Sequence, residues 1–288
     1  MPNPPGGGTD FVARAISSKM PEIIGESMVV DNRSGAAGLV GTMVAARALA
    51  DGYTLLVVDN SFAINVSYYK DAKYNALKDF APLTDIADTF YVLTVNPSLP
   101  IATVPEFIAM AKNQPGKIVL ASPGNGTAAH LTTALIMLKT GIEITHVPYR
   151  GGGPAVADVV GGQVQSTFAS GPNAVPLVKA GRLKALASTA SKRHSMLADV
   201  PTFVELGFKD IVVTNWYGIV AIGGTPRPVL DKLHAAMVRI IAMPDVKERL
   251  ASIGLDPAPM SQEAFRELIA AETTRWAGVV NASGIKPE

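Results

Sequence analysis

The chain has 288 residues, of which 48% are hydrophobic and 17% are charged, and its formal net charge is +1. This length is sufficient for two α/β lobes, each with a buried core. Lysine and arginine are spread along the whole chain, which argues against a binding surface for nucleic acid or an anionic membrane. Glycine, proline or charge interrupts every apolar stretch before the roughly 18 residues that a membrane-spanning helix requires.

Residues that commonly carry catalysis or bind metals are few. Cysteine is absent, which excludes thiol nucleophiles, thiolate metal sites and disulfides. The four histidines are far apart in the sequence and no pair has the spacing of metal ligands; they are His130, His146, His194 and His234. We therefore expect no metal site and no cofactor.

The first quarter of the chain alternates helix-period and β-branched segments. Apolar residues recur on one helical face over Thr9–Ile24, and a second helix is expected over Leu39–Leu49. Strands are expected at Met28–Val30 and Tyr53–Val58. Such alternation predicts a mostly parallel sheet with helices on both faces.

Four further helix–strand pairs follow a turn-rich segment at Asn96–Pro100. They are expected at residues 104–112 with 118–121, 127–138 with 144–147, 155–160 with 164–168, and 174–180 with 183–187. Four such pairs in one continuous segment predict a compact second lobe.

The remainder of the chain is expected to return to the first lobe. Two strands, Val212–Trp216 and Gly218–Ile222, lead into helices that begin with Thr225 as N-cap and Pro226 at the first helical position. A long helix over Gln262–Ser283 closes the chain. The sequence thus predicts an α/β fold in which residues 1–97 and 218–288 form lobe 1 and residues 98–217 form lobe 2, with the ligand cleft between them.

Three glycine-rich loops precede helices, at residues 5–10, 122–127 and 149–154. Glycine allows backbone N–H groups to approach a ligand, and the amino end of a helix attracts anions. The middle loop matches a dinucleotide pattern at Gly124, Gly126 and Ala129, but the acid Glu143 precedes the next strand instead of following it, which argues against a dinucleotide. No nucleophile elbow, phosphate loop or metalloprotease helix is present, so no catalytic residue is expected.

Ordered motifs along the whole chain resemble those of the Bug-type solute receptors, the extracytoplasmic binding proteins of tripartite tricarboxylate transporters. They include Pro-Pro-Gly-Gly-Gly-Thr-Asp at residues 4–10, Asp-Gly-Tyr-Thr-Leu at 51–55, Val-Asn-Pro-Ser-Leu at 95–99, Ser-Pro-Gly-x-Gly-Thr at 122–127, Val-Pro-Tyr-Arg-Gly at 147–151, Lys-Ala-Gly-Arg-Leu at 179–183 and Trp-Tyr-Gly at 216–218.

This resemblance implies a Venus-flytrap fold of the type II-like periplasmic binding proteins and a periplasmic location. It also implies a monomeric receptor without enzymatic activity, which captures a small organic carboxylate and delivers it to the permease subunits of the transporter. In such receptors backbone amides hold the carboxylate.

The resemblance also implies the ligand-binding residues. On lobe 1 they are Gly8, Thr9 and Asp10, with Asn60 and Ser61 in the loop after the strand Tyr53–Val58; on lobe 2 they are Gly126, Thr127, His130, Tyr149, Gly151, Ala169 and Ser170. For His130 a helix-stabilising role stays open, and for Tyr149 and Trp216 packing in the core is favoured. Phe62, Phe168 and Ser170 are candidates for the selectivity of the cleft walls, with a core role open for both phenylalanines.

Two departures from the family pattern bear on the chain and its ligand. Almost nothing precedes the Pro-Pro-Gly-Gly-Gly loop where the family has a β-strand, so we expect that a leader peptide and part of the first strand are absent from this chain. Ala169 follows Phe168 where many relatives carry Asp, which argues against an amino-acid ligand. Dicarboxylates, tricarboxylates, aromatic acids and monocarboxylates all stay open, as do an enzyme on a similar fold and a ligand sensor for a signalling partner.

Overall fold

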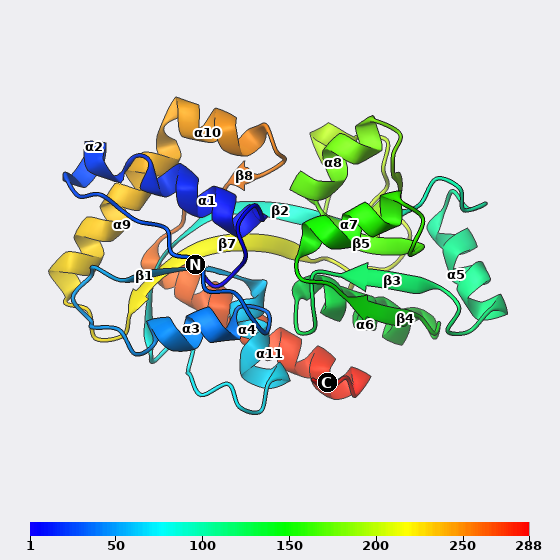
Figure 1. Cartoon of the computed structure of the whole chain (residues 1–288), viewed down its shortest axis with the longest axis horizontal. Helices are drawn as coiled ribbons and strands as arrows, with labels where there is room; N and C mark the ends of the chain where they lie inside the picture. The colour runs from blue at the N-terminus through cyan, green and yellow to red at the C-terminus, as the bar shows by residue number, and fades with distance from the viewer. Residues whose placement is uncertain (288) are drawn as a thin grey trace. The chain divides into compact units, whose positions relative to one another are not determined.

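The computed structural model describes residues 1–287, which form two compact units (Figure 1). Unit 1 comprises Met1–Asp88 and Trp216–Gly278, and unit 2 comprises Thr89–Asn215 and Val279–Lys286. The chain leaves unit 1 within strand β2 (Phe80–Val95) and returns within strand β7 (Thr214–Ile222). The assignment of two ligand-binding lobes to residues 1–97 with 218–288 and to residues 98–217 stays a prediction.

Unit 1 is built on strands β1 and β7 and the first part of β2. Strand β1 spans Leu55–Asp59. The other elements of unit 1 are α1 (Gly8–Ser17), α2 (Met20–Ile24), α3 (Leu39–Ala45), α4 (Asn60–Tyr68), α9 (Arg227–Ala242), α10 (Pro244–Ala251), β8 (Asp256–Pro257) and α11 (Gln262–Ser283). β7 lies between β1 and β2, and β1 is antiparallel to β7 with Leu55 opposite Ala221 and Asp59 opposite Tyr217.

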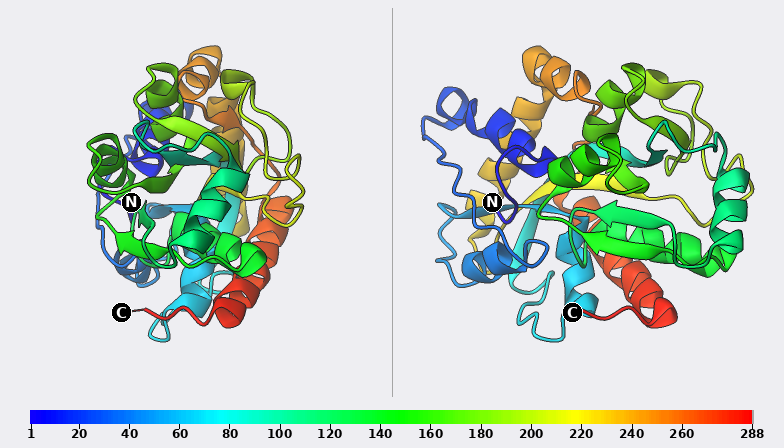
Figure 2. Two further views of the ribbon diagram at one scale, coloured as in Figure 1. Left: turned by 90° about the vertical axis from the view of Figure 1, so that its right-hand side faces the viewer. Right: turned by 45° about the vertical axis from the view of Figure 1, so that its right-hand side comes forward.

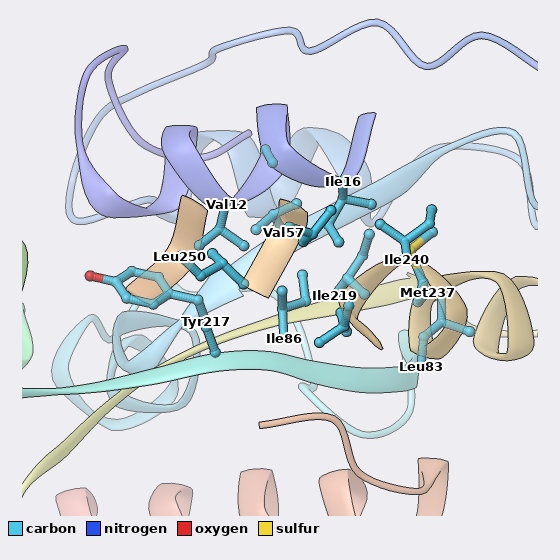
Figure 3. Packing of buried hydrophobic residues seen from close by; sticks show 14 of the residues in the cluster. Val12, Ile16, Val57, Leu83, Ile86, Tyr217, Ile219, Met237, Ile240 and Leu250 are labelled. Carbon is cyan, nitrogen blue, oxygen red and sulfur yellow. The ribbon is translucent and has the colours of Figure 1, made fainter. Parts of the chain in front are cut away.

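The strands of unit 1 separate two apolar cores, because successive side chains of a strand point to opposite faces. One core joins α1, α9 and α10 to Val57 and Ile219, as Figure 3 shows. The other joins α4 and α11 to Leu56 and Val220. In both views of Figure 2, α10 (orange) and α11 (red) lie on opposite sides of the strands. Unit 1 is therefore a three-layer α/β structure.

Unit 2 contains three parallel strands. Its elements besides β2 are α5 (Val104–Asn113), β3 (Val119–Ser122), α6 (Ala128–Thr140), β4 (Thr145–Pro148), α7 (Gly152–Val160), β5 (Ser166–Ser170), α8 (Gly171–Lys179), β6 (Lys184–Ser188) and a 3₁₀ turn, η1 (Ser195–Leu197). β3 is parallel to both β4 and β5, whereas β2 is antiparallel to β5 and β6.

The direction of β3, β4 and β5 decides where the helices of unit 2 begin. Each of these strands is followed by a helix, so α6, α7 and α8 all begin at the carboxyl edge of the three strands. α7 and α8 cover one face, in an apolar core with Ala121 and Ala169. In an open α/β sheet this edge is the usual position of a ligand site.

Several predicted elements need correction in unit 1. The single helix predicted over Thr9–Ile24 is two helices, because Pro21 lacks the N–H that a continuous helix requires. The predicted strand Met28–Val30 is extended but pairs with no strand among residues 1–287. The helix predicted over Leu39–Leu49 ends at Ala45, where i to i+3 hydrogen bonds tighten the chain.

Other corrections concern positions near the ends of β1 and β7. Asn60 and Ser61 begin α4 and are not in a loop. The two strands predicted on either side of Tyr217 form the single strand β7. Gly218 lies within this strand and leaves the space that the ring of Phe265 occupies. Thr225 is not the cap of α9, since Pro226 takes that position. The sequence did not predict β2 or α4.

Candidate functional site

The start of α1 is organised around the carboxylate of Asp10, which is 4% exposed. Its Oδ2 accepts hydrogen bonds from the backbone N–H of Gly6 (3.1 Å) and from Nε of Arg14 (2.9 Å), and its Oδ1 accepts one from Nδ2 of Asn32 (3.0 Å). Burial opposes ionisation, but these hydrogen bonds outweigh it and lower the pKa of Asp10. Both carboxylate oxygens of Asp10 are therefore engaged in holding the glycine-rich loop.

A second carboxylate, Asp59, links the starts of α1 and α4. As N-cap of α4, its Oδ1 accepts from the backbone N–H of Ser61 (2.9 Å). Its Oδ2 accepts from Nδ2 of Asn3 (2.7 Å) and from the hydroxyl of Thr9 (3.3 Å). Asp59 thus connects two predicted site residues, Thr9 at the start of α1 and Ser61 at the start of α4. The sequence analysis did not single out this acid.

Asn60 and Ser61 differ in what their side chains contact. The amide of Asn60 is buried: Nδ2 donates to Oε2 of Glu272 (3.1 Å) and Oδ1 accepts from the backbone N–H of Trp216 (3.3 Å). The hydroxyl of Ser61 makes no hydrogen bond to the described residues. Asn60 ties α4 to α11 and β7, whereas Ser61 keeps a hydroxyl at the start of a helix.

Gly8 meets the phenol ring of Tyr217. A Cβ atom at residue 8 would lie 2.5 Å from the Tyr217 hydroxyl oxygen, which is closer than side chains approach. In Figure 3 this hydroxyl points away from the aliphatic side chains of the core. Glycine is required at the first position of α1 because the ring of Tyr217 occupies the space.

The start of α6 is closed by its own residues. Thr127 caps the helix: its hydroxyl oxygen accepts from the backbone N–H of His130 (3.4 Å). In return Nδ1 of His130 accepts from the backbone N–H of Gly126 (3.2 Å). The N–H of Gly126 is therefore already bonded. His130 supports the loop before α6, which corresponds to the helix-stabilising role that the sequence left open for it.

The structure brings together two histidines that are distant in the sequence. The rings of His130 and His146 are stacked, with centroids 4.0 Å apart and planes at 17°. Nε2 of His146 lies 2.6 Å from the hydroxyl oxygen of Ser122. Burial lowers the pKa of His130 to about 3, with a contribution from His146, and burial lowers the pKa of His146 to about 4. Both rings are neutral at physiological pH.

The start of α7 is formed by the loop that contains Tyr149 and Gly151. The hydroxyl of Tyr149 donates to Oδ2 of Asp158 (2.7 Å), and its ring packs against the apolar core, which fits the packing role favoured from the sequence. Gly151 has a φ of +117°, which side chains rarely adopt, and its N–H donates to the carbonyl of Pro123 (3.0 Å). Arg150, between them, is exposed and has no ion pair with the described residues.

The start of α8 directly follows β5. Ala169 is buried, and Ser170 is the N-cap, whose hydroxyl oxygen accepts from Nδ2 of Asn173 (3.3 Å). Asn173 also reaches the start of α7, since a Cβ atom at Gly152 would lie 2.7 Å from its Nδ2. The sequence analysis missed Asn173, although the proline after Gly171 marks the start of a helix; Gly152 was included only as part of the glycine-rich loop at residues 149–154.

The helix starts of unit 2 share one property: none of α6, α7 and α8 carries an acid in its first turn. The backbone N–H groups of Gly152, Gly153 and Gly171 make no hydrogen bond to the described residues. Such N–H groups, aligned with helix dipoles and next to a free guanidinium, can hold an anion.

Phe62 and Phe168 do not contribute to this edge. Phe62 is 3% exposed and packs against Tyr74 and Phe80, and Phe168 is 1% exposed and lies near Phe203. Both take the core role that the sequence left open.

Another pair of titratable groups lies on β2, within unit 1. The carboxyl groups of Asp85 and Asp88 interact, and one oxygen of each is buried without a donor among the described residues. Burial, together with the charge of Asp88, raises the pKa of Asp85, and burial raises that of Asp88. A proton shared between the two groups supplies the missing hydrogen bond.

Two other classes of site were sought among residues 1–287. No group of three or more metal-binding side chains is present there. In the same residues no helix is both long and apolar enough to span a membrane.

Comparison with known proteins places this geometry in context. The family model for tripartite tricarboxylate transporter family receptors matches residues 12–285. The periplasmic binding protein BugD is 32% identical, with a TM-score of 0.92 over 100% of this chain and 97% of BugD. These findings confirm the resemblance drawn from the motifs and the predicted α/β fold class.

Two similar structures contain a named ligand. An R. palustris protein solved with adipate is 32% identical, with a TM-score of 0.93 over 100% of this chain and 96% of that protein. MatC from Rhodopseudomonas palustris, solved with bound malate, is 31% identical, with a TM-score of 0.91 over 97% of this chain and 96% of MatC.

Proposed function

The chain belongs to the family of tripartite tricarboxylate transporter receptors, and from that premise we propose that it binds an aliphatic dicarboxylate in the periplasm and delivers it to a membrane permease. The family is one of solute-binding receptors. Relatives solved with malate and with adipate support the ligand class, since both ligands are aliphatic dicarboxylates.

The observation that carries the proposal is the carboxyl edge of β3, β4 and β5 in unit 2. Three helices begin there without an acid in the first turn, and the N–H groups of Gly152, Gly153 and Gly171 have no acceptor among residues 1–287. A buried carboxylate is stable only when its oxygens are hydrogen-bonded, and free backbone donors meet that need without a counter-charge. Arg150 adds one positive charge at the same loop.

The predicted site residues divide into two roles under this proposal. Gly151 and Ser170 of unit 2 directly precede α7 and α8, whose free N–H groups contact the ligand. Asp10 and His130 hold their loops in place, since their polar atoms bond to the protein itself. The absence of an acid at Ala169 suits a ligand without an ammonium group.

A charge change at Gly153 tests the proposal without disturbing the fold. No atom lies within 4 Å of a Cβ built on Gly153, so both alanine and aspartate fit there. Gly153→Ala retains the N–H groups and is the matched control. Gly153→Asp places a negative charge in the first turn of α7, which favours the helix but repels an anion.

The measurement is isothermal titration of the full chain with malate, succinate, adipate, citrate, benzoate and L-aspartate. We expect saturable binding of a dicarboxylate, equal affinity in Gly153→Ala, and an affinity about tenfold weaker in Gly153→Asp. Both variants should unfold at or above the temperature of the unsubstituted chain. Equal affinities of the two variants, or binding of L-aspartate in preference to every dicarboxylate, would contradict the proposal.

A further inference from the structure

The loop before α6 is supported by a side chain of β4, His146. This residue lies opposite Leu120 of β3 in the parallel pair, and Ser122 follows two residues after Leu120. Side chains two residues apart on a strand share a face, so His146 and Ser122 lie on the same face of β3 and β4. This face is opposite to that of Ala121, which packs in the core with α7 and α8. His130 of α6 stacks on His146 there, with ring centroids 4.0 Å apart.

The hydroxyl group of Ser122 has three polar neighbours, which together fix the position of its single proton. The oxygen accepts from the backbone N–H of Gly124 (3.2 Å), and it lies 3.1 Å from the carbonyl oxygen of Gly124 and 2.6 Å from Nε2 of His146. A carbonyl oxygen cannot donate, so the hydroxyl proton points to it. Nε2 of His146 then carries a proton and donates to the hydroxyl. All three contacts are hydrogen bonds only when His146 is the Nε2–H tautomer.

His130 has the same tautomer, because Nδ1 of its ring accepts from the N–H of Gly126 (3.2 Å) and its proton is therefore on Nε2. The two stacked rings thus hold both glycines of the loop. His146 holds Gly124 through Ser122, and His130 holds Gly126 directly. Gly124 and Gly126 have φ values of +143° and +75°. Because glycine has access to many backbone conformations, these hydrogen bonds select one of them.

The loop leads to two free N–H groups at the start of α6. Ala128 is 2% exposed and Ala129 is 0% exposed, and their backbone N–H groups make no hydrogen bond to the described residues. A buried backbone N–H is nearly always hydrogen-bonded, so these two groups need an acceptor beyond residues 1–287. The conformation of residues 122–127 decides where both groups point, because the loop sets the first turn of the helix.

We propose that His146 is a positioning residue for the ligand, acting through the hydrogen bond from its Nε2 to Ser122. This bond orders the loop of residues 122–127 and thereby aligns the N–H groups of Ala128 and Ala129 toward the carboxylate. The inference rests on the proposed function, because the carboxylate is the acceptor that it requires. His146 itself does not contact the ligand.

Two substitutions separate the hydrogen bond from the stack. His146→Gln retains an N–H donor but lacks the ring, whereas His146→Phe retains a ring that stacks on His130 but cannot donate. The full chain is titrated calorimetrically with malate, succinate and adipate. We expect the affinity for the dicarboxylate bound most tightly to change by less than about threefold in His146→Gln and to be about tenfold weaker in His146→Phe. A role confined to packing requires the reverse order. The reverse order, or equal affinities of the two variants, would overturn the proposal.

Ser122→Ala removes the other partner of the same hydrogen bond and leaves both histidine rings in place. We expect its affinity to be weaker by at least about tenfold, and the double variant Ser122→Ala/His146→Phe to be no weaker than Ser122→Ala alone. Losses that add in the double variant would show that the two side chains act separately, which would overturn the proposal.

The tautomer of His146 is measured without a ligand. Nitrogen–proton correlation spectra of the full chain with isotope-labelled histidine, at neutral pH, should show a protonated Nε2 and an unprotonated Nδ1 for the signals that disappear in His146→Gln. An Nδ1–H tautomer would overturn this proposal and leave the proposed function standing. Failure of the unsubstituted chain to bind any of the three dicarboxylates would instead overturn the proposed function, and this inference with it.

Discussion

Two helix starts of unit 1, those of α1 and α4, differ in their chemistry from three helix starts of unit 2, those of α6, α7 and α8. In unit 1 the starts of α1 and α4 each carry an acid, the buried Asp10 and the half-buried Asp59, which accept hydrogen bonds from backbone N–H groups. In unit 2 the starts of α6, α7 and α8 carry no acid, and the loop before α6 is held by a neutral histidine, His130. The starts of α6, α7 and α8 therefore leave the positive ends of these helices without an acid in the first turn, whereas an acid lies at the starts of α1 and α4.

This difference separates holding a loop from binding an anion. An acid at a helix start satisfies N–H groups and stabilises the loop, but it also repels a second carboxylate. A neutral imidazole satisfies an N–H group without adding negative charge. Unit 2 can therefore keep an ordered loop and an edge that attracts anions. We expect stability to depend on the charge of the side chain that accepts the hydrogen bond from the loop, which is Asp10 in unit 1 and His130 in unit 2.

The largest effect is expected from protonating the stacked histidines. Their folded pKa values, about 3 and about 4, lie below the ordinary value of 6.5, so the unfolded chain binds protons first as the pH falls. The contribution of the two histidines to the free energy of unfolding should be complete above pH 6.5 and should decrease, by about 3 kcal/mol for each histidine, as the pH drops toward about 4. Chemical denaturation at several pH values measures this slope.

The variant His146→Gln is the control for that slope. Its amide can still bond to the Ser122 hydroxyl but does not titrate, so the decrease between pH 6.5 and 4 should become smaller. A slope identical to that of the unsubstituted chain would show that the decrease arises from other groups.

A smaller effect is expected from Asp10→Ala in unit 1. This change leaves the N–H of Gly6 and the amide of Asn32 without their acceptor and costs about 2 kcal/mol of unfolding free energy. Asp31→Ala removes an ion pair whose two side chains are both more than half exposed, and it should cost less than about 0.5 kcal/mol. Similar costs for both variants would show that the loop does not depend on its acid.

The smallest effect is expected from Asp85→Asn, with a pH dependence opposite to that of the histidines. Because the pKa of Asp85 is raised, the folded chain retains a proton that the unfolded chain loses above about 3.8, and stability falls as the pH rises through the folded pKa. The asparagine amide replaces the shared proton permanently, so this variant should exceed the unsubstituted chain by about 1 kcal/mol at pH 9. A constant difference from pH 5 to pH 9 would contradict the shared proton.

The sequence predicted the elements of unit 2 better than those of unit 1. β3, β4 and β5 are short strands, and each is followed by glycine and a helix, so local signals were sufficient to predict them. Strand β2, which begins in unit 1, is buried along most of its length and has no alternation, and its residues Thr84 and Asp85 resemble a polar loop. Pairing with distant strands determines β2, and a single sequence does not show pairing.

The candidate site was predictable where it depends on the backbone. Gly151 lies in a glycine-rich turn, which is a local signal, whereas Ser170 came from the resemblance to the receptor family. The contacts of Asp59 with Asn3 and Thr9, the stack of His130 on His146, and the approach of Asn173 to Gly152 join separate segments. No spacing rule connects such positions, so only the fold reveals them.

The contact between Gly8 and Tyr217 limits how this receptor can diverge. Any side chain at position 8 would collide with the phenol ring, and the ring is fixed by the core beneath β7. The two positions are far apart in the sequence, but their side chains would occupy the same space. Substitutions at them are therefore coupled during evolution: a relative with alanine or serine at the position of Gly8 should carry a residue smaller than tyrosine at the position of Tyr217.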